Sequence, residues 1–318
     1  MFNRIVIQDL PKQVLRELEA LAGLHDRSIE AEARQALRAW VEQPPAASNR
    51  NTRRSAIAAR LNRVLVQENA VRQGGKLTPS HIAEAIGETR GEDVEDWFLG
   101  EKEPGFLHLC AIARLLGVDA GWLKHGDGTP YPGEWKRLPQ NPYAAVNWLL
   151  NWDDGESVTS AQVAALHLVR AIKATGGLYI VKASDRGHFK AYSTPVHVSE
   201  EIGAGGEASL AALFVTLELL YRRYVACDGR FAVHAYLMHA EDIALLTQGE
   251  THPASLLKES DRSMWWEDIW DAKQVPKHSY WDGWQSLHHR IEGVIAARSD
   301  LNELRAKIRQ GAITMPPG

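Results

Sequence analysis

Residues 2–43 read FNRIVIQDLPKQVLRELEALAGLHDRSIEAEARQALRAWVEQ, and this stretch decides the expected fold of the N-terminus. Polar and apolar side chains alternate over 4–8, which predicts a short strand with one buried face. Apolar residues at helical spacing over 11–22 and 29–41 predict two helices, the second capped by Ser28. About forty residues arranged in this way cannot bury their apolar faces alone. We therefore expect two chains to pair their strands antiparallel and to interlock their helices.

The paired strands would form a two-stranded ribbon, and a ribbon of this kind fits the DNA major groove. The quoted stretch resembles the ribbon-helix-helix (Arc/MetJ-like) family, especially its plasmid-stability antitoxin branch, whose second helix opens with a similar RSxEAExR pattern. The resemblance implies that Arg4, Val6 and Gln8 face the bases. It also implies that Arg27 and the amides at Ser28 hold a phosphate. The alternative is a strand-helix-helix fragment of a larger α+β domain.

Two segments rich in proline and polar residues predict linkers, one at residues 44–54 and one at residues 129–142. They divide the chain into an N-terminal unit of residues 1–43, a helical unit of residues 55–128 and a C-terminal domain of residues 143–318. The expected fold class is mainly α with α+β: a βαα unit, a five-helix unit and a C-terminal α+β domain.

Residues 55–128 resemble the λ-repressor-like helix-turn-helix family in the order of their apolar and turn residues. The matching positions are Leu77-Thr78, Ile82-Ala83, Gly87, Val94, Trp97, Gly100, Pro104, Leu107, Ile112-Ala113, Leu116-Gly117-Val118 and Trp122-Leu123. The resemblance implies a second DNA-reading surface. Its candidate contacts are Thr78, Arg90 and Lys102, supported by Arg53 and Arg54.

The expected recognition helix of this unit is acidic, because it carries Glu92, Asp93, Glu95 and Asp96. DNA affinity comes largely from neutralising phosphates, and four carboxylates oppose that. A carboxylate can accept a hydrogen bond from cytosine N4, but a good site uses one or two of them. The favoured interpretation is a helix-turn-helix fold kept for dimerisation or for docking a basic partner, and the alternative is a second operator-reading head.

The composition of the 318-residue chain is that of a soluble globular protein with a net charge of −4, so any DNA-binding surface must be a local basic patch. The chain has only two cysteines, Cys110 and Cys227, which argues against a disulfide framework or a zinc site and fits a reducing cytoplasm. The start of the chain does not resemble a secretory signal. The apolar run Leu210–Tyr221 is too short to span a bilayer and predicts a buried helix.

The C-terminal domain has the pattern of an α+β fold. The expected strands are Leu178–Ala183, Phe189–Val198 and Phe231–Met238, and the expected helices are Tyr143–Trp152, Ser160–Thr175, Ser209–Val225, Glu241–Leu246 and Ser286–Gln310.

Several motifs in this domain could carry chemistry, but each has a simpler explanation. The glycine-rich segment 203–209 lacks the lysine of a P-loop and predicts a flexible turn. The pairs His234 with His239 and His288 with His289 match no metal-binding spacing. A cluster of tryptophans close together in the sequence predicts core packing, and the alternative is a partner or ligand surface. The cluster consists of Trp265, Trp266, Trp270, Trp281 and Trp284.

The sequence therefore predicts a cytoplasmic transcriptional regulator, a repressor that binds double-stranded operator DNA as a homodimer or higher oligomer, with no enzymatic activity, metal or cofactor. The C-terminal domain is expected to serve sensing, oligomerisation or partner binding. A small effector or a protein partner would bind the C-terminal domain. One alternative is an antitoxin-like protein whose C-terminal domain neutralises a protein and which regulates its own gene through DNA binding. Another is an architectural or partition protein.

Overall fold

The computed structural model describes most of the chain, and its contacts divide it into two compact units, Met1–Ala56 and Ile57–Gly318. The described residues are 14–15, 18–19, 22–23, 27–42, 45–152, 161–172, 175–227 and 229–311.

The described part of the first unit contains helix α2 (Ile29–Glu42) and the start of helix α3 (Pro45–Val71). The predicted strand over 4–8 lies outside the described residues. The segment predicted as a linker, residues 44–54, is helical from Pro45 on, where α3 begins. Proline suits the first turn of a helix, where its missing N–H is not needed, and neither glycine nor proline follows it for many residues.

The second unit begins with a bundle formed by the rest of α3 and four short helices, here called the helical unit. These are α4 (Pro79–Ile86), α5 (Gly91–Leu99), α6 (Phe106–Leu116) and α7 (Ala120–His125). Gly87 ends α4 in the left-handed region at φ 82°, as the sequence predicted for this turn. The core of the bundle is fully buried and includes Ile57, Leu61, Ile82, Val94, Leu109, Ile112 and Leu123.

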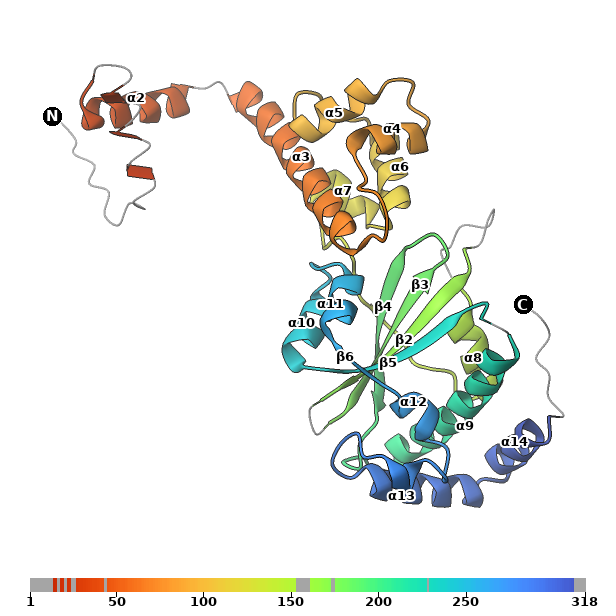
Figure 1. Cartoon of the computed structure of the whole chain (residues 1–318). Helices are drawn as coiled ribbons and strands as arrows, with labels where there is room; N and C mark the ends of the chain where they lie inside the picture. Colours follow the sequence, from red (N-terminus) through yellow and green to blue (C-terminus); the bar gives the residue numbers. More distant parts are fainter. Residues whose placement is uncertain are drawn as a thin grey trace. The chain divides into compact units, whose positions relative to one another are not determined.

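A mixed sheet of six strands forms the centre of the C-terminal part (Figure 1), in the order β1-β4-β3-β2-β5-β6. The pairs β1/β4 and β2/β5 are parallel, whereas β2/β3, β3/β4 and β5/β6 are antiparallel. The strands are β1 (Glu134–Trp135), β2 (Val163–Ala171), β3 (Gly177–Ser184), β4 (Phe189–His197), β5 (Ala232–Met238) and β6 (Asp261–Ser263).

Helices cover both faces of this sheet (Figure 1). The larger core lies on the face that carries α8 (Pro142–Leu150), α9 (Ala204–Ala226), α12 (Trp265–Asp268), the 3-10 turn η1 (Val275–Lys277), α13 (Trp284–Ala297) and α14 (Ser299–Arg309). The smaller core lies under α10 (Ala240–Gln248) and α11 (Pro253–Glu259). The predicted α+β class of this part is confirmed.

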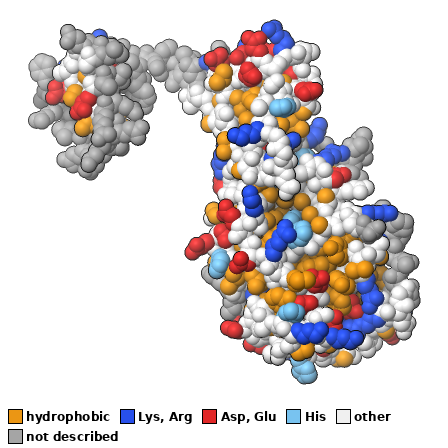
Figure 2. All heavy atoms as spheres, in the orientation of Figure 1, with side chains coloured by type: hydrophobic (Ala, Val, Ile, Leu, Met, Phe, Trp, Pro, Cys, Tyr) orange, Lys and Arg blue, Asp and Glu red, His pale blue; other side chains and the backbone are white. Residues whose placement is uncertain are grey.

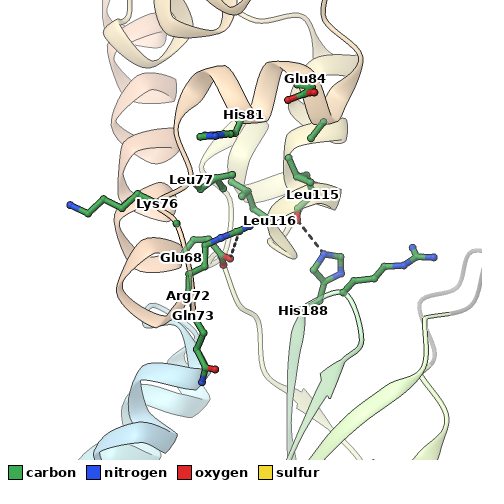
Figure 3. Close-up of a pocket in the computed structure, with 14 residues that line it drawn as sticks. Glu68, Arg72, Gln73, Lys76, Leu77, His81, Glu84, Leu115, Leu116 and His188 are labelled. Atoms are coloured by element: carbon green, nitrogen blue, oxygen red, sulfur yellow. Dashed lines mark hydrogen bonds and ion pairs between the residues drawn. The ribbon is translucent and has the colours of Figure 1, made fainter. Parts of the chain in front are cut away.

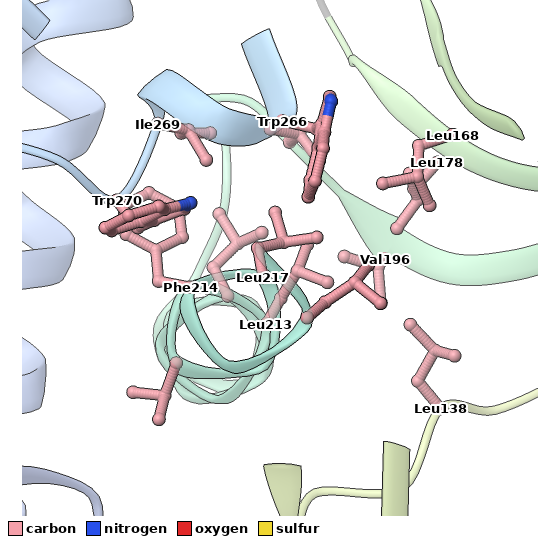
Figure 4. Packing of buried hydrophobic residues seen from close by; sticks show 14 of the residues in the cluster. Leu138, Leu168, Leu178, Val196, Leu213, Phe214, Leu217, Trp266, Ile269 and Trp270 are labelled. Atoms are coloured by element: carbon pink, nitrogen blue, oxygen red, sulfur yellow. The ribbon is translucent and has the colours of Figure 1, made fainter. Parts of the chain in front are cut away.

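Helix α9 is the central helix of the larger core (Figure 4), where Leu213, Phe214 and Leu217 point toward tryptophans and sheet residues. With 23 residues it is long and apolar enough to cross a membrane by those two criteria alone. The prediction that this segment is too short was wrong, because the helix continues beyond the apolar run. The prediction of a buried helix is confirmed, since residues 210–220 are all buried.

The sequence assigned a helix to Ser160–Thr175, and this was wrong: the described part forms strand β2, Val163–Ala171. Both faces of β2 are covered, so its apolar residues run almost continuously and lack the alternation of a half-buried strand. The single predicted helix Ser286–Gln310 is two helices, α13 and α14, because the backbone is extended at Arg298. The three strands predicted from alternation are confirmed as β3, β4 and β5.

The predicted linker at 129–142 is built into the second unit at both of its ends. Tyr131 is 5% exposed and packs into the core of the helical unit, and its amide donates to the carbonyl of Gly249. Three residues further on, β1 pairs with β4. Trp135, on β1, is exposed. Residues 57–318 therefore form one compact unit in place of two linked domains.

Candidate functional site

The first candidate surface is the start of α2. The Ser28 hydroxyl accepts from the Ala31 amide at 3.2 Å, which is the N-cap expected from the sequence. Arg27 precedes it and lies 3.6 Å from the carboxylate of Glu32. A cation and a helix N-terminus are thus adjacent, and that is an arrangement that favours an anion. Arg4, Val6 and Gln8 lie outside the described residues.

The second candidate surface is on the helical unit, and its polar side chains already have partners within the unit. Thr78 caps α4, with its hydroxyl 2.7 Å from Nδ1 of His81. Arg90 precedes α5 and pairs with Glu92 at 2.9 Å. Arg53 and Arg54 lie half-buried on α3, away from the start of α5 in the sequence. Within the second unit, Thr78 and Arg90 are thus each paired with a neighbouring side chain.

Lys102 lies between two carboxylates of α5, 2.7 Å from Asp96 and 3.0 Å from Asp93. These two ion pairs raise the pKa of Lys102 above its ordinary value, Asp96 more strongly than Asp93. The same contact lowers the pKa of Asp93. Both cations next to α5, Arg90 and Lys102, are thus engaged by its own acidic side chains.

The surface around α5 is strongly acidic as a result. Residues 88–103 carry seven carboxylates and two full cations. The net negative charge of this stretch is therefore larger than the −4 of the whole chain. Figure 2 shows acidic side chains gathered over this part of the helical unit. The carboxylates belong to Glu88, Glu92, Asp93, Glu95, Asp96, Glu101 and Glu103.

A cavity of about 630 Å³ lies between the helical unit and the turn that joins β3 to β4 (Figure 3). One wall comes from the helical unit, from the ends of α3 and α6, the segment between α3 and α4, and α4 itself. The opposite wall is formed by the turn residues Arg186, Gly187 and His188. Glu68 and Arg72 face this space, 3.5 Å apart, and burial raises the pKa of Glu68. One ring nitrogen of His188, Nε2, lies 3.3 Å from the carbonyl of Leu115.

His188 fixes this turn against the end of α6. An added Cβ at Gly117 would lie 2.8 Å from the His188 ring, and Gly117 has a φ of +64°. Only glycine satisfies both the backbone conformation and the close approach. The turn between β3 and β4 is therefore wedged between the sheet and the helical unit.

The histidines of the sheet form a polar cluster on the face of the smaller core. His167 is 8% exposed, its Nδ1 lies 3.2 Å from the hydroxyl of Tyr236, and its ring centroid is 5.4 Å from that of His234. Burial, and then the charges of His234 and Arg262, lowers the pKa of His167 to about 3. His239, paired with His234 in the sequence, is exposed at the start of α10. Within the described ranges no group of three or more histidine, cysteine or acidic side chains could hold a metal ion.

The tryptophan crowd is a core feature, as predicted. Trp265, Trp266, Trp270 and Trp284 are at most 8% exposed and belong to the larger core, and Figure 4 shows Trp266 and Trp270 beside α9. Trp281, the fifth tryptophan, is half-buried against the same core. The glycine-rich segment 203–209 was predicted to be a flexible turn, and this was wrong, since it forms the first turn of α9.

Sequence reasoning missed the buried charges of the C-terminal part. Glu218 on α9 is 1% exposed and accepts from Nε of Arg305 at 2.6 Å and from Nε of Arg309 at 2.7 Å. Arg170 is 2% exposed, donates to the carbonyls of Val198 and Ala171, and lies 3.9 Å from the ring centroid of Trp281. A glutamate inside an apolar helical run was the one signal in the sequence.

In a comparison with known proteins, the N-terminal segment is similar to ribbon-helix-helix domains. The matching family model is Antitoxin FitA-like, ribbon-helix-helix, and it covers residues 4–41. No curated protein and no solved structure matches the chain. The matched range does not include residues 55–128, so their resemblance to λ-repressor-like domains stays a prediction.

Proposed function

We propose that this protein is a sequence-specific transcriptional regulator, a cytoplasmic repressor that reads the major groove of operator DNA with a dimeric β-ribbon. The single observation that carries the proposal is the match of residues 4–41 to a ribbon-helix-helix antitoxin domain. Domains of this class bind DNA as dimers through their paired strands. Arg4, Val6 and Gln8 would contact base edges, and Arg27 with the start of α2 would hold a phosphate.

In this proposal the helical unit is not a DNA-reading head. Arg90 and Lys102 are paired with carboxylates of α5, so moving them to phosphates would expose those carboxylates to the DNA charge. We assign the helical unit to contacts with protein. No reaction is assigned to the C-terminal part.

The test is binding of the full-length protein to the promoter of its own gene, by DNase footprinting and by titration at fixed salt. Arg4→Ala and Gln8→Ala should each weaken specific binding by about 1–3 kcal/mol, because each removes hydrogen bonds to base edges. Arg90→Ala is the matched control and should change affinity by well under about tenfold. If only the Arg90 variant lost binding with the fold intact, the helical unit would be the reading head.

The footprint also separates this proposal from an architectural or partition role, which would protect long stretches of DNA cooperatively. The name of the matching family favours a second candidate function, an antitoxin that regulates its own gene. In that case the C-terminal part would neutralise a toxic protein. The test is co-expression with the product of the neighbouring gene. If that product arrests growth, and if residues 57–318 and the full-length Arg4→Ala variant both relieve the arrest, the antitoxin function is favoured.

A further inference from the structure

A second cavity, of about 880 Å³, lies where the helical unit meets the sheet. It shares Arg186 and His188 with the cavity of Figure 3, so the turn between β3 and β4 borders both. Its volume is within the range of about 300–1,000 Å³ that is usual for small-molecule sites, and such sites are common where two parts of a protein meet.

Aromatic side chains supply much of the apolar wall of this second cavity, namely Tyr131, Trp152 and Phe189. Tyr131 and Phe189 both lie edge-on to the ring of His252, with centroid separations of 4.9 Å and 5.1 Å. His252 is itself buried, and its side chain accepts from a backbone amide at the start of α11. The two rings are therefore held against a fixed neighbour, and a preformed wall of this kind lowers the entropy lost when a ligand binds.

The charged side chains of the lining are engaged within the protein or exposed to water. Arg114, Arg186 and Lys190 each interact with other groups of the chain. Asp119 caps α7, accepting from a backbone amide at 2.6 Å. Glu134 is exposed on β1, where water solvates its charge. A charged ligand would therefore lose hydration without gaining a free, buried counter-charge, whereas a neutral ligand would not incur this cost.

We propose that this cavity binds a small neutral aromatic molecule with one or two fused rings. The rings would lie against Tyr131, Trp152 and Phe189, since contacts between aromatic rings stabilise a complex beyond the burial of apolar area. The bound molecule would contact the helical unit through Val118 and the sheet through Phe189. The site does not depend on DNA binding, so its failure and the failure of the proposed function are distinguishable.

The test uses calorimetric titration of the full-length protein with 2-naphthol, which should bind with a Kd below about 1 mM. Decahydro-2-naphthol has the same two rings in saturated form and should bind about three- to tenfold more weakly, because it lacks the aromatic contacts. The anion 2-naphthoate should bind at least about tenfold more weakly than 2-naphthol, because its charge must be desolvated without a free partner.

Variants place the binding in this cavity. Ala120 lines it at the start of α7, and Ala120→Phe should weaken 2-naphthol binding at least about tenfold, because the added ring occupies space that the ligand needs. Ala244→Phe is the matched control, since Ala244 is exposed on α10 and lines neither cavity, and it should change the affinity by less than about twofold. Should Ala120→Phe fail to fold, Phe189→Leu removes one ring from the wall and should weaken binding about three- to tenfold.

The proposal is overturned if 2-naphthol does not bind at concentrations up to about 1 mM, or if 2-naphthoate binds more tightly than 2-naphthol. Equal effects of Ala120→Phe and Ala244→Phe would also overturn it, as would an affinity of Phe189→Leu equal to that of the wild type.

Discussion

His167 offers a direct test of how burial is coupled to stability in the sheet. Its ring is 8% exposed and faces Tyr236, His234 and Arg262, none of which is an anion that could stabilise an imidazolium. The folded protein therefore lowers the pKa of His167 to about 3, whereas the unfolded chain should hold the same proton with a pKa near 6.5. Folding thus requires the neutral ring.

The sign and size of the effect follow from this difference. A group whose pKa is lowered by folding contributes its full stability above its unfolded pKa and loses it as the pH falls toward its folded pKa. Below pH 6.5, the free energy of unfolding falls by about 1.4 kcal/mol for each pH unit, until the pH is low enough for the folded protein to take up the proton as well. Acidification from pH 7 to pH 4 should therefore cost about 3 kcal/mol through His167.

The measurement is urea unfolding of the wild type and of His167→Gln across this pH range. The glutamine amide can still hydrogen-bond to the hydroxyl of Tyr236 but does not titrate, so the variant should lose about 3 kcal/mol less than the wild type on acidification. His239→Gln, at an exposed position, is the control and should change stability by less than about 0.5 kcal/mol at either pH. Parallel pH profiles for the wild type and His167→Gln would refute the reasoning.

Two further predictions concern stability in urea. Glu218→Gln should destabilise the protein by about 3 kcal/mol, because it removes the buried charge that faces Arg305. Arg309→Gln, at the half-exposed end of the same network, should cost less than about 1 kcal/mol. Equal losses of stability would contradict the role of burial in this difference. Gly117→Ala should cost at least about 1 kcal/mol more than Gly128→Ala, since both have positive φ but only Gly117 meets a neighbouring ring.

Local signals in the sequence predicted the elements whose stabilisation is local. The hydroxyl of Ser28 caps the helix that follows it, and Gly87 ends α4 in the conformation that glycine favours. The half-buried strands were recognised because polar and apolar residues alternate along them. Strand β2 was missed because it is covered on both faces, which erases the alternation that would distinguish it from a helix.

The candidate sites were less predictable, because they depend on residues far apart in the chain. Arg72 and His188 are far apart in the chain, and only the fold brings them to the cavity of Figure 3. The acidic character of α5 could be predicted from sequence alone. The pairing of Lys102 with α5 could not be predicted in this way. Lys102 lies after the end of the helix, and only the turn at Gly100 brings its side chain back to Asp93 and Asp96.

The short segment around β1 limits how this protein could be rearranged during evolution. Between Tyr131, which completes the core of the helical unit, and Trp135, which is paired in the sheet, there are only three residues. A recombination breakpoint placed there would separate the helical unit from its contacts with the C-terminal part, among them the hydrogen bond from the Tyr131 amide to Gly249 and the contact of His188 with the carbonyl of Leu115. Gene fusions that exchange only the helices or only the sheet should thus be selected against, and the smallest portable piece is the whole of residues 57–318.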